Sequence, residues 1–317
     1  MKLWALHLAV IAGLFAAQFV LSPYLATSLA RILVLAVFAM GYNLAFGYTG
    51  LLSLGHALFL AAGVYAAALP ASVLGLGAGP AFLLAVLAGG ALALALGLLA
   101  LRTSGVSFMI VTLMFAQAGY LTVLYFGPVT GGDEGFTLSA EARNLLGLDL
   151  SSDGPRFTAA LGLFATALLI NLALVRSPFG RRMVAIRENE ERSRMLGVNP
   201  FAVKLAALAV SGLYAGAAGG AYALLFGYAG ANFATIQYSI LPMLYVLLGG
   251  AGTTLGPLLG AIMMFGLIEL AARLARVWPV LEGLDLFLVG AALIILVLFA
   301  PRGVLGTLRE RWLRWLP

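Results

Sequence analysis

The stretch RSPFGRRMVAIRENEERSRMLGVNPFAVK, Arg176–Lys204, is the longest strongly charged segment in an otherwise apolar chain. It holds seven of the 18 lysine and arginine residues and three of the 12 acidic residues. Ser177-Pro178 is typical of a helix start. We predict a short surface helix over Gly180–Leu196 that ends at Gly197 and Asn199-Pro200. Such a helix is typical of a docking element. Alternatively, the segment is a solvated loop without a partner, which would also explain its charge.

The composition around this segment indicates an integral membrane protein. Hydrophobic residues make up 63% of the chain, charged residues 9%, and the mean hydropathy is +1.07, whereas about a quarter of residues in globular domains are charged. The apolar runs are continuous rather than alternating, which favours helices over a barrel. The net charge of +6 lies in short loops, where it sets membrane orientation. We therefore expect contact with membrane lipid and no nucleic-acid binding.

Two further residue types bear on packing and chemistry. Glycine occurs 39 times, and patches at Gly89-Gly90, Gly212, Gly216 and Gly219-Gly220 are predicted to let helix backbones approach closely. Cysteine is absent, which excludes disulfides, thiolate metal sites and cysteine nucleophiles. The sequence thus favours a densely packed bundle.

Ten apolar runs are long enough, or nearly so, to cross a hydrocarbon core of about 20 helical residues. They are Leu3–Leu21, Leu25–Phe46, Leu51–Leu69, Ala81–Leu101, Ser104–Phe126, Phe157–Val175, Leu205–Tyr228, Ile236–Leu248, Leu255–Ala272 and Leu284–Ala300. The eighth run is short and contains Pro242, so a broken or re-entrant helix there would lower the count to nine or eight. We predict an all-α polytopic membrane helical bundle in which residues 1–317 form one transmembrane domain.

The basic residues predict the orientation of this bundle. Lysine and arginine concentrate in cytoplasmic loops, and placing both termini and residues 176–204 in the cytoplasm satisfies the main clusters. The polar segment 127–156, with five acids and two arginines, then forms an external loop. Exceptions are Arg273 and Arg276 in an outer loop, and Arg31 near the outer end of the second helix, where its side chain can snorkel to the interface.

A weak internal repeat supports the same topology. Phe46–Gly50, FGYTG, recurs as Phe226–Gly230, FGYAG, 180 residues later. Each copy follows a long helix, and the predicted topology places them on opposite sides of the membrane. This arrangement is typical of inverted repeats, here helices two to five against seven to ten. Chance similarity is the alternative.

The sequence predicts a transport permease rather than an enzyme. It contains two histidines, no HExxH motif and no phosphate-binding loop, so we expect no catalytic site, metal or cofactor. The apolar runs contain few ionisable groups, although a carrier driven by protons or sodium usually requires more of them. We therefore expect an energy source outside this chain.

Polar residues cluster around the first FGYxG motif and predict a translocation path. The candidates are Asn43, Tyr48, Ser53 and His56, with Gln117 in the fifth helix. Ser53, His56 and Phe59 are spaced so that they share one face of a helix. Alternatively, these side chains hydrogen-bond between helices as structural contacts, an interpretation that is stronger for Gln117.

Four blocks together resemble a known family. They are FGYTGLLSLGHALFLAAGVYAA (Phe46–Ala67), RTSGVSFMIVTLMFAQ (Arg102–Gln117) with TGGDEGF (Thr130–Phe136), SPFGRRMVAIRENEERSRMLGVNPFAVKL (Ser177–Leu205) and GGAGTTLGPLLGA (Gly249–Ala261). They resemble branched-chain amino acid ABC transporter permeases, most closely the M-type subunit. The resemblance implies a type II ABC importer fold in the plasma (inner) membrane of a bacterium or archaeon. The implied partners are an H-type paralogous permease, two cytoplasmic ATP-binding subunits and an external substrate-binding protein.

The resemblance also assigns a coupling role to the basic segment. Glu191, Ser193 and Gly197 fall on the family's Glu-Ala-Ala-x-x-x-Gly coupling pattern, and Arg187 and Glu188 belong to the same implied helix. Arg192 and Ser193 replace the two alanines and no Ile-x-Leu-Pro follows, so the contact geometry of the family does not carry over in detail. The implied mechanism is alternating access driven by the ATPases.

Several alternatives stay open at this point. Related permeases import urea or amides, or sugars or nucleosides, and the sequence does not contain the binding protein that selects the substrate. A stand-alone secondary carrier and a non-transporting membrane scaffold are alternatives from other classes.

Overall fold

The computed structural model describes residues 2–145, 147–277 and 303–311, together with residues 290, 291, 294 and 298. In this part of the chain, seven helices are long and apolar enough to cross a membrane. These spans are α2 (Pro23–Asn43) with its continuation to Tyr48, α3 (His56–Val73), α4 (Ala78–Ala100), α5 (Gly105–Tyr125), α7 (Asp153–Arg176), α10 (Pro200–Phe226) and most of α12 (Gly256–Val277). The prediction of a polytopic helical membrane bundle is confirmed.

Two predicted crossings correspond to shorter apolar helices, α1 (Lys2–Ala17) and α11 (Gln237–Gly249). The last predicted run, Leu284–Ala300, lies largely outside the described residues. The count of ten crossings therefore stays a prediction.

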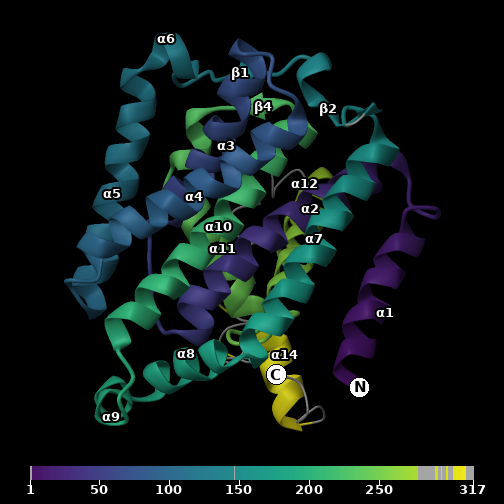
Figure 1. Ribbon diagram of the computed structural model, residues 1–317. Helices are drawn as coiled ribbons and strands as arrows, with labels where there is room; N and C mark the ends of the chain where they lie inside the picture. Colours follow the sequence, from purple (N-terminus) through teal and green to yellow (C-terminus); the bar gives the residue numbers. More distant parts are fainter. Residues whose placement is uncertain are drawn as a thin grey trace.

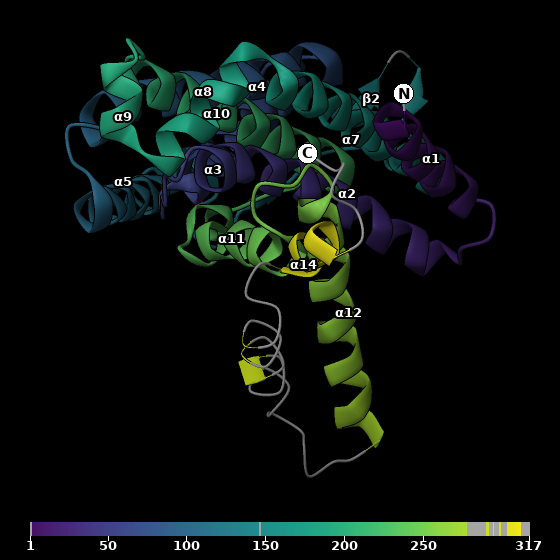
Figure 2. The same cartoon turned by 90° about the horizontal axis from the view of Figure 1, so that it is seen from below.

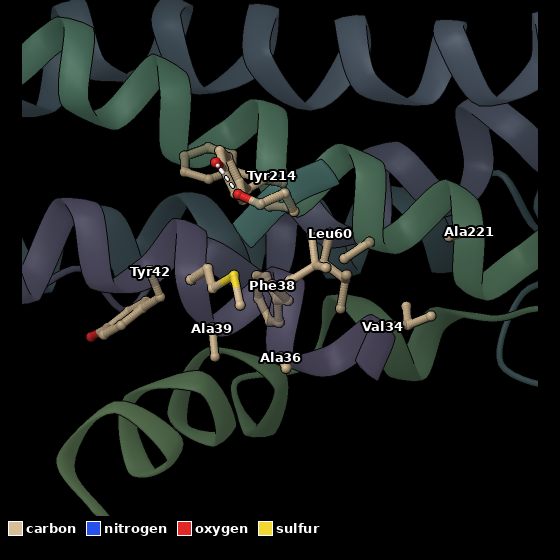
Figure 3. Packing of buried hydrophobic residues seen from close by; sticks show 14 of the residues in the cluster. Val34, Ala36, Phe38, Ala39, Tyr42, Leu60, Tyr214 and Ala221 are labelled. Carbon is tan, nitrogen blue, oxygen red and sulfur yellow. Dashed lines mark hydrogen bonds between the residues drawn. The ribbon is translucent and has the colours of Figure 1, made fainter. Parts of the chain in front are cut away.

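Helix α2 forms the centre of the bundle. It is the most enclosed of the described spans and packs against α7, α10, α11 and α12. Figure 3 shows its side chains beside those of α3 and α10; the labelled residues are Val34, Ala36, Phe38, Ala39, Tyr42, Leu60, Tyr214 and Ala221. The hydroxyl of Tyr214 donates a hydrogen bond to the carbonyl of Ala167 in α7 (2.9 Å), which ties a fourth helix to this core.

Glycines allow α10 to lie directly against α3 and α4. A Cβ added to Gly216 would come within 2.3 Å of the Ala85 carbonyl oxygen, and one added to Gly63 within 2.4 Å of the Gly216 carbonyl oxygen. Gly89 and Gly212 meet in the same way, each with its added Cβ 2.5 Å from the other's carbonyl oxygen. The predicted close approach of helix backbones is confirmed at these positions.

The two ends of the bundle differ in charge and structure (Figure 1). One end, which we call the basic end, holds α8 (Pro178–Glu188), α9 (Glu190–Met195), α14 (Gly303–Arg311) and the first residues of α1. The opposite, acidic end holds the polar segment 127–156. Seen from the basic end, α12 projects away from the other helices (Figure 2). The first FGYxG copy lies at the basic end and the second at the acidic end, as the repeat hypothesis requires, but the repeat itself stays a prediction.

The acidic end is an ordered structure rather than a simple loop. It comprises α6 (Gly127–Thr130), β1 (Phe136–Thr137), a 3-10 turn at Glu141–Arg143, β2 (Asn144–Leu145) and β3 (Leu148–Asp149). Strand β1 pairs antiparallel with β4 (Tyr228–Ala229), which follows α10 and precedes a 3-10 turn at Ala231–Ala234, and β2 pairs with β3. The segment is thereby attached to the end of α10.

Two arginines of the segment cap α10. Arg143 donates to the carbonyls of Leu224 (3.0 Å) and Leu225 (3.2 Å), and Arg156 also donates to Leu225 (3.1 Å). Cations at a helix C-terminus stabilise the helix dipole. Nearby, Ser151 hydrogen-bonds to Asp149 through its hydroxyl and its backbone N–H and lowers the pKa of that carboxyl group.

Two predicted helices differ from the structure. The predicted helix Leu51–Leu69 begins only at His56, because Gly50 has a left-handed backbone (φ +79°) and residues 51–55 are non-helical. The prediction that Ser53 shares a helix face with His56 is therefore wrong. The predicted single helix Gly180–Leu196 is two helices, because Asn189 adopts an extended backbone (φ −160°) between them.

Candidate coupling and translocation site

Two side-chain caps build the α8–α9 segment at the basic end, and a third starts the helix that follows it. The Ser177 hydroxyl accepts from the N–H groups of Phe179 (3.1 Å) and Gly180 (3.3 Å), with Pro178 in the first turn. Asn189 Oδ1 accepts from Arg192 N (2.8 Å) at the start of α9, and the side chain of Asn199 caps α10. These caps satisfy N–H groups that a helix start leaves unpaired, so the sequence itself specifies two short helices and their ends.

The segment has one face against the bundle and one face free. Gly180, Met183 and Ile186 recur at a spacing of three and are buried, whereas Arg181 and Arg182 are exposed. Lys204 in α10 binds Glu190 (2.5 Å), which also pairs with Arg194 at 3.6 Å. This ion pair and the buried apolar residues hold the segment to the membrane helices.

The five coupling residues expected from the sequence have different environments. Glu188 and Glu191 are exposed. Ser193 is buried and its hydroxyl donates to the Asn189 carbonyl (2.9 Å). Gly197 ends the segment with a left-handed backbone (φ +82°) and open space around its Cα. Arg187 is also exposed over much of its surface, but its guanidinium turns towards the bundle and donates a hydrogen bond to the carbonyl of Gly47.

A cavity of about 760 Å³ lies beside the segment at the basic end. It is bounded by residues 49–52, by the α4–α5 connection at residues 101–106, and by residues 186–190. Arg102, Arg194 and Lys204 also line it. The cavity separates part of α8 and α9 from the membrane helices.

The turn that ends α2 contains the contact for Arg187. Residues Leu44–Tyr48 form one π-helical turn, a distortion frequent at functional sites. Asn43, at its start, is fully buried and fixes a distant segment: its Nδ2 donates to the Thr253 carbonyl (2.8 Å) and its Oδ1 accepts from Gly252 N (2.9 Å). Asn43 thereby joins α2 to the connection between α11 and α12.

The other translocation candidates lie in several places. Tyr48 is buried, and the Ser53 hydroxyl, also buried, accepts from Gly55 N (3.1 Å). His56 Nε2 lies 2.8 Å from the hydroxyl of Ser211 in α10. Gln117 is exposed on α5. The five candidates therefore do not surround one cavity, and none of them lines the cavity beside α8.

Sequence reasoning missed Thr253, the partner of Asn43, and other polar residues that form bonds near these candidates. Thr253 and Thr254 lie in GGAGTTLGPLLGA, and Thr254 Oγ1 lies 2.8 Å from His7 Nε2 of α1. Ser239 of α11 accepts from Ala57 N (2.9 Å), at the start of α3. Polar residues in glycine-rich breaks between apolar runs were the available signal, but nothing in the sequence indicates which break pairs with which helix.

Fold and site together define the class of protein: a multi-pass helical membrane protein with an ordered basic segment linked to the ends of its central helices. Within the described residues, no group of acidic, histidine or cysteine side chains is placed to hold a metal ion. A family model described as "Branched-chain amino acid transport system / permease component" matches residues 24–298. The chain belongs to this family of ABC transport permeases.

Individual relatives agree with the family. The chain is 30% identical over 297 residues to the high-affinity branched-chain amino acid transport system permease protein LivM of Escherichia coli, covering 87% of this chain and 68% of the relative. The LivM protein of Salmonella typhimurium is 29% identical over 298 residues with the same coverage. A shorter match, 31% over 112 residues and a third of each chain, is to the autoinducer 2 import system permease protein LsrC of Photorhabdus laumondii. No solved structure matches the chain.

Proposed function

We propose that this chain is a transmembrane permease subunit of an ABC importer that moves branched-chain amino acids into the cytoplasm. Separate ATPase subunits drive the transport. An H-type permease forms the other half of the pore, two ATP-binding subunits dock in the cytoplasm, and an external binding protein delivers the substrate. The basic end then faces the cytoplasm of a bacterial or archaeal cell, with both termini on that side.

The observation that carries this proposal is the capped α8–α9 segment. A loop that served only to orient the protein would need positive charge but no ordered caps. Here two short helices follow one another at one end of the bundle, with exposed arginines on the outer face and a hydrogen bond from Arg187 to the end of α2 on the inner face. Glu188, Glu191, Ser193 and Gly197 are proposed to form or support the surface that meets the ATPase.

The translocation path is proposed to follow the polar residues expected from the sequence. Gln117 is exposed on α5 and is assigned to the wall of the path. Asn43, Tyr48, Ser53 and His56 are buried and are assigned to the packing that shapes this wall. A ligand shifts a conformational equilibrium only through its different affinities for the two states, so a path with few substrate contacts suits release into the cytoplasm.

The test begins with purification of the chain from its native membrane and identification of the bound subunits. The complex is then placed in proteoliposomes, and uptake of labelled leucine is measured with and without ATP and the binding protein. ATP-dependent uptake that requires the binding protein supports the proposal. Uptake driven by an ion gradient without an ATPase would instead identify a secondary carrier.

Competition identifies the substrate class. Unlabelled valine and isoleucine should suppress leucine uptake, whereas urea, ribose and autoinducer 2 should not. The autoinducer belongs in the panel because of the shorter match to LsrC. Competition by urea or a sugar, and none by valine, would assign the permease to a related importer.

A further inference from the structure

The π-helical turn at the end of α2 has one carbonyl that is bonded from outside. The carbonyl of Leu44 accepts from the Thr49 hydroxyl (2.8 Å), that of Ala45 from Leu51 N (2.8 Å) and that of Phe46 from Gly50 N (3.0 Å). Each of these donors belongs to the residues that directly follow the turn. The next carbonyl, of Gly47, accepts instead from Arg187 of α8. A helix end must satisfy its last carbonyls, and here α8 supplies one of the donors.

The same turn is fixed on its other side by Asn43. A Cβ added to Gly47 would come within 1.8 Å of Asn43 Oδ1 and 2.6 Å of Gly252 N, so the amide of Asn43 occupies the space that a side chain would fill. The Arg187 guanidinium also lies close to Gly252, at 3.2 Å from an added Cβ. Arg187, Gly47, Asn43 and the 252–253 connection are therefore in continuous contact.

This contact reaches three further elements. Thr253 Oγ1 donates to the Gly250 carbonyl (2.8 Å) and accepts from Gly256 N (3.1 Å), the first residue of α12. Thr254 binds His7 of α1. Gly303, at the start of α14, lies directly against the backbone of Gly250. The ends of α1, α2, α11, α12 and α14 thus meet at one junction. Among the residues that the structure describes, Arg187 is the one through which α8 is hydrogen-bonded to it.

The cavity beside α8 limits the contacts through which a movement of this helix can reach the junction. On the side of residues 101–106, the segment borders a cavity rather than packed side chains. At Gly50, in contrast, it is in contact with the end of α2 through Arg187, whose Cγ would lie 3.3 Å from an added Cβ. A hydrogen bond from a guanidinium to a carbonyl is charge-assisted and directional, whereas hydrophobic contacts are non-directional. Movement of α8 is then passed to the junction chiefly where Arg187 holds the end of α2.

We propose that Arg187 is a positioning residue that transmits movement of the α8–α9 segment to the junction of α2 with α11 and α12, rather than a residue that binds the ATPase. The inference rests on the proposed function and refines it. Among the coupling residues, Arg187 acts on the inner face of the segment. Loss of its guanidinium leaves the outer face intact for docking but disconnects ATP hydrolysis from the helices of the pore.

The test uses the complete transporter in proteoliposomes and measures ATP hydrolysis and leucine uptake on the same sample. Arg187→Met keeps the length of the side chain and removes the donors, whereas Arg187→Lys keeps a donor. In R187M, uptake should fall at least about tenfold, the factor expected when one charge-assisted hydrogen bond is lost. ATP hydrolysis should fall far less, so the ATP consumed per leucine imported rises. R187K should regain part of the coupling.

Arg181→Met is the matched control, because Arg181 is exposed on the same helix. R181M should keep the wild-type ratio of ATP consumed to leucine imported. The ATPase that co-purifies with each variant separates transmission from docking: in R187M it should equal the wild-type amount. A loss of bound ATPase in proportion to the loss of uptake would overturn the proposal, as would a normal ratio in R187M. Absence of ATP-driven uptake by the wild-type complex would overturn the proposed function itself.

Discussion

Replacing Asn43 with leucine removes the side chain that joins α2 to the α11–α12 connection. Leucine has a similar size but offers neither donor nor acceptor. Gly252 N–H and the Thr253 carbonyl, both on buried residues, then lose their partner. Each buried polar group left unpaired costs about 1–3 kcal/mol, so the two together destabilise the native state by about 2–6 kcal/mol. At roughly 2–4 °C per kcal/mol, the melting temperature should fall by roughly 4–24 °C.

Asn171 in α7 provides the matched control. It is fully buried, and within the described part of the chain neither its Oδ1 nor its Nδ2 has a hydrogen-bond partner. Asn171→Leu therefore makes the same chemical change without breaking a bond, and the melting temperature should stay level or rise. The assay is thermal unfolding of the purified complex in detergent, followed by intrinsic fluorescence. Equal melting temperatures for N43L and N171L would refute the role given to the Asn43 bonds.

Three further predictions test other features. Gly216→Leu places a side chain against the backbone of α4, an overpacking that costs about 1–3 kcal/mol or more, so the fraction of monodisperse protein in size-exclusion chromatography should fall; Gly162→Leu, at an exposed glycine with open space around it, should leave it unchanged. Arg143→Gln removes two charge-assisted hydrogen bonds from the C-terminus of α10, so protease cleavage within residues 127–156 should become faster by about tenfold. An unchanged cleavage rate would show that the Arg143 cap does not stabilise this segment. Gly197→Trp adds the cost of a left-handed residue, about 1–2 kcal/mol, without a clash inside the chain, and it places a large side chain on the surface proposed to meet the ATPase. Uptake should therefore stop at normal protein levels. Gly75→Trp, with a similar left-handed backbone (φ +63°) at the opposite end, should leave uptake intact.

Local patterns predicted the helices well because an apolar run of sufficient length has few alternatives in a membrane. The predicted run Ala81–Leu101 is α4 (Ala78–Ala100), and the predicted Ser104–Phe126 is α5 (Gly105–Tyr125). Glycine spacing also predicted the close contact of helix backbones. The start of α3 was predicted too early because the non-helical residues 51–55 are mostly apolar, with Ser53 as the one polar side chain among them.

The candidate site was predictable only in part. Charge and caps located the α8–α9 segment, but its break at Asn189 depends on a single side chain that prefers to cap rather than continue a helix. The polar residues around FGYTG were found as a cluster, whereas their bonds cross the chain: Asn43 to Thr253 and His56 to Ser211. Pairings of this kind depend on the three-dimensional arrangement of helices, and a single sequence carries no direct record of it.

The central position of α2 has a consequence for biosynthesis. Asn43 and its partner Thr253 are 210 residues apart, and at about 5–20 residues per second a ribosome needs on the order of 10–40 s to make the intervening chain. During that time α2, with Arg31 in it, has reached the membrane without α10, α11 and α12, the helices that will cover it. The machinery that inserts the nascent chain into the membrane, or the helices made early, must shield α2 until the second half of the chain is inserted. Truncated chains that end before α10 are therefore expected to be prime substrates for membrane quality-control proteases.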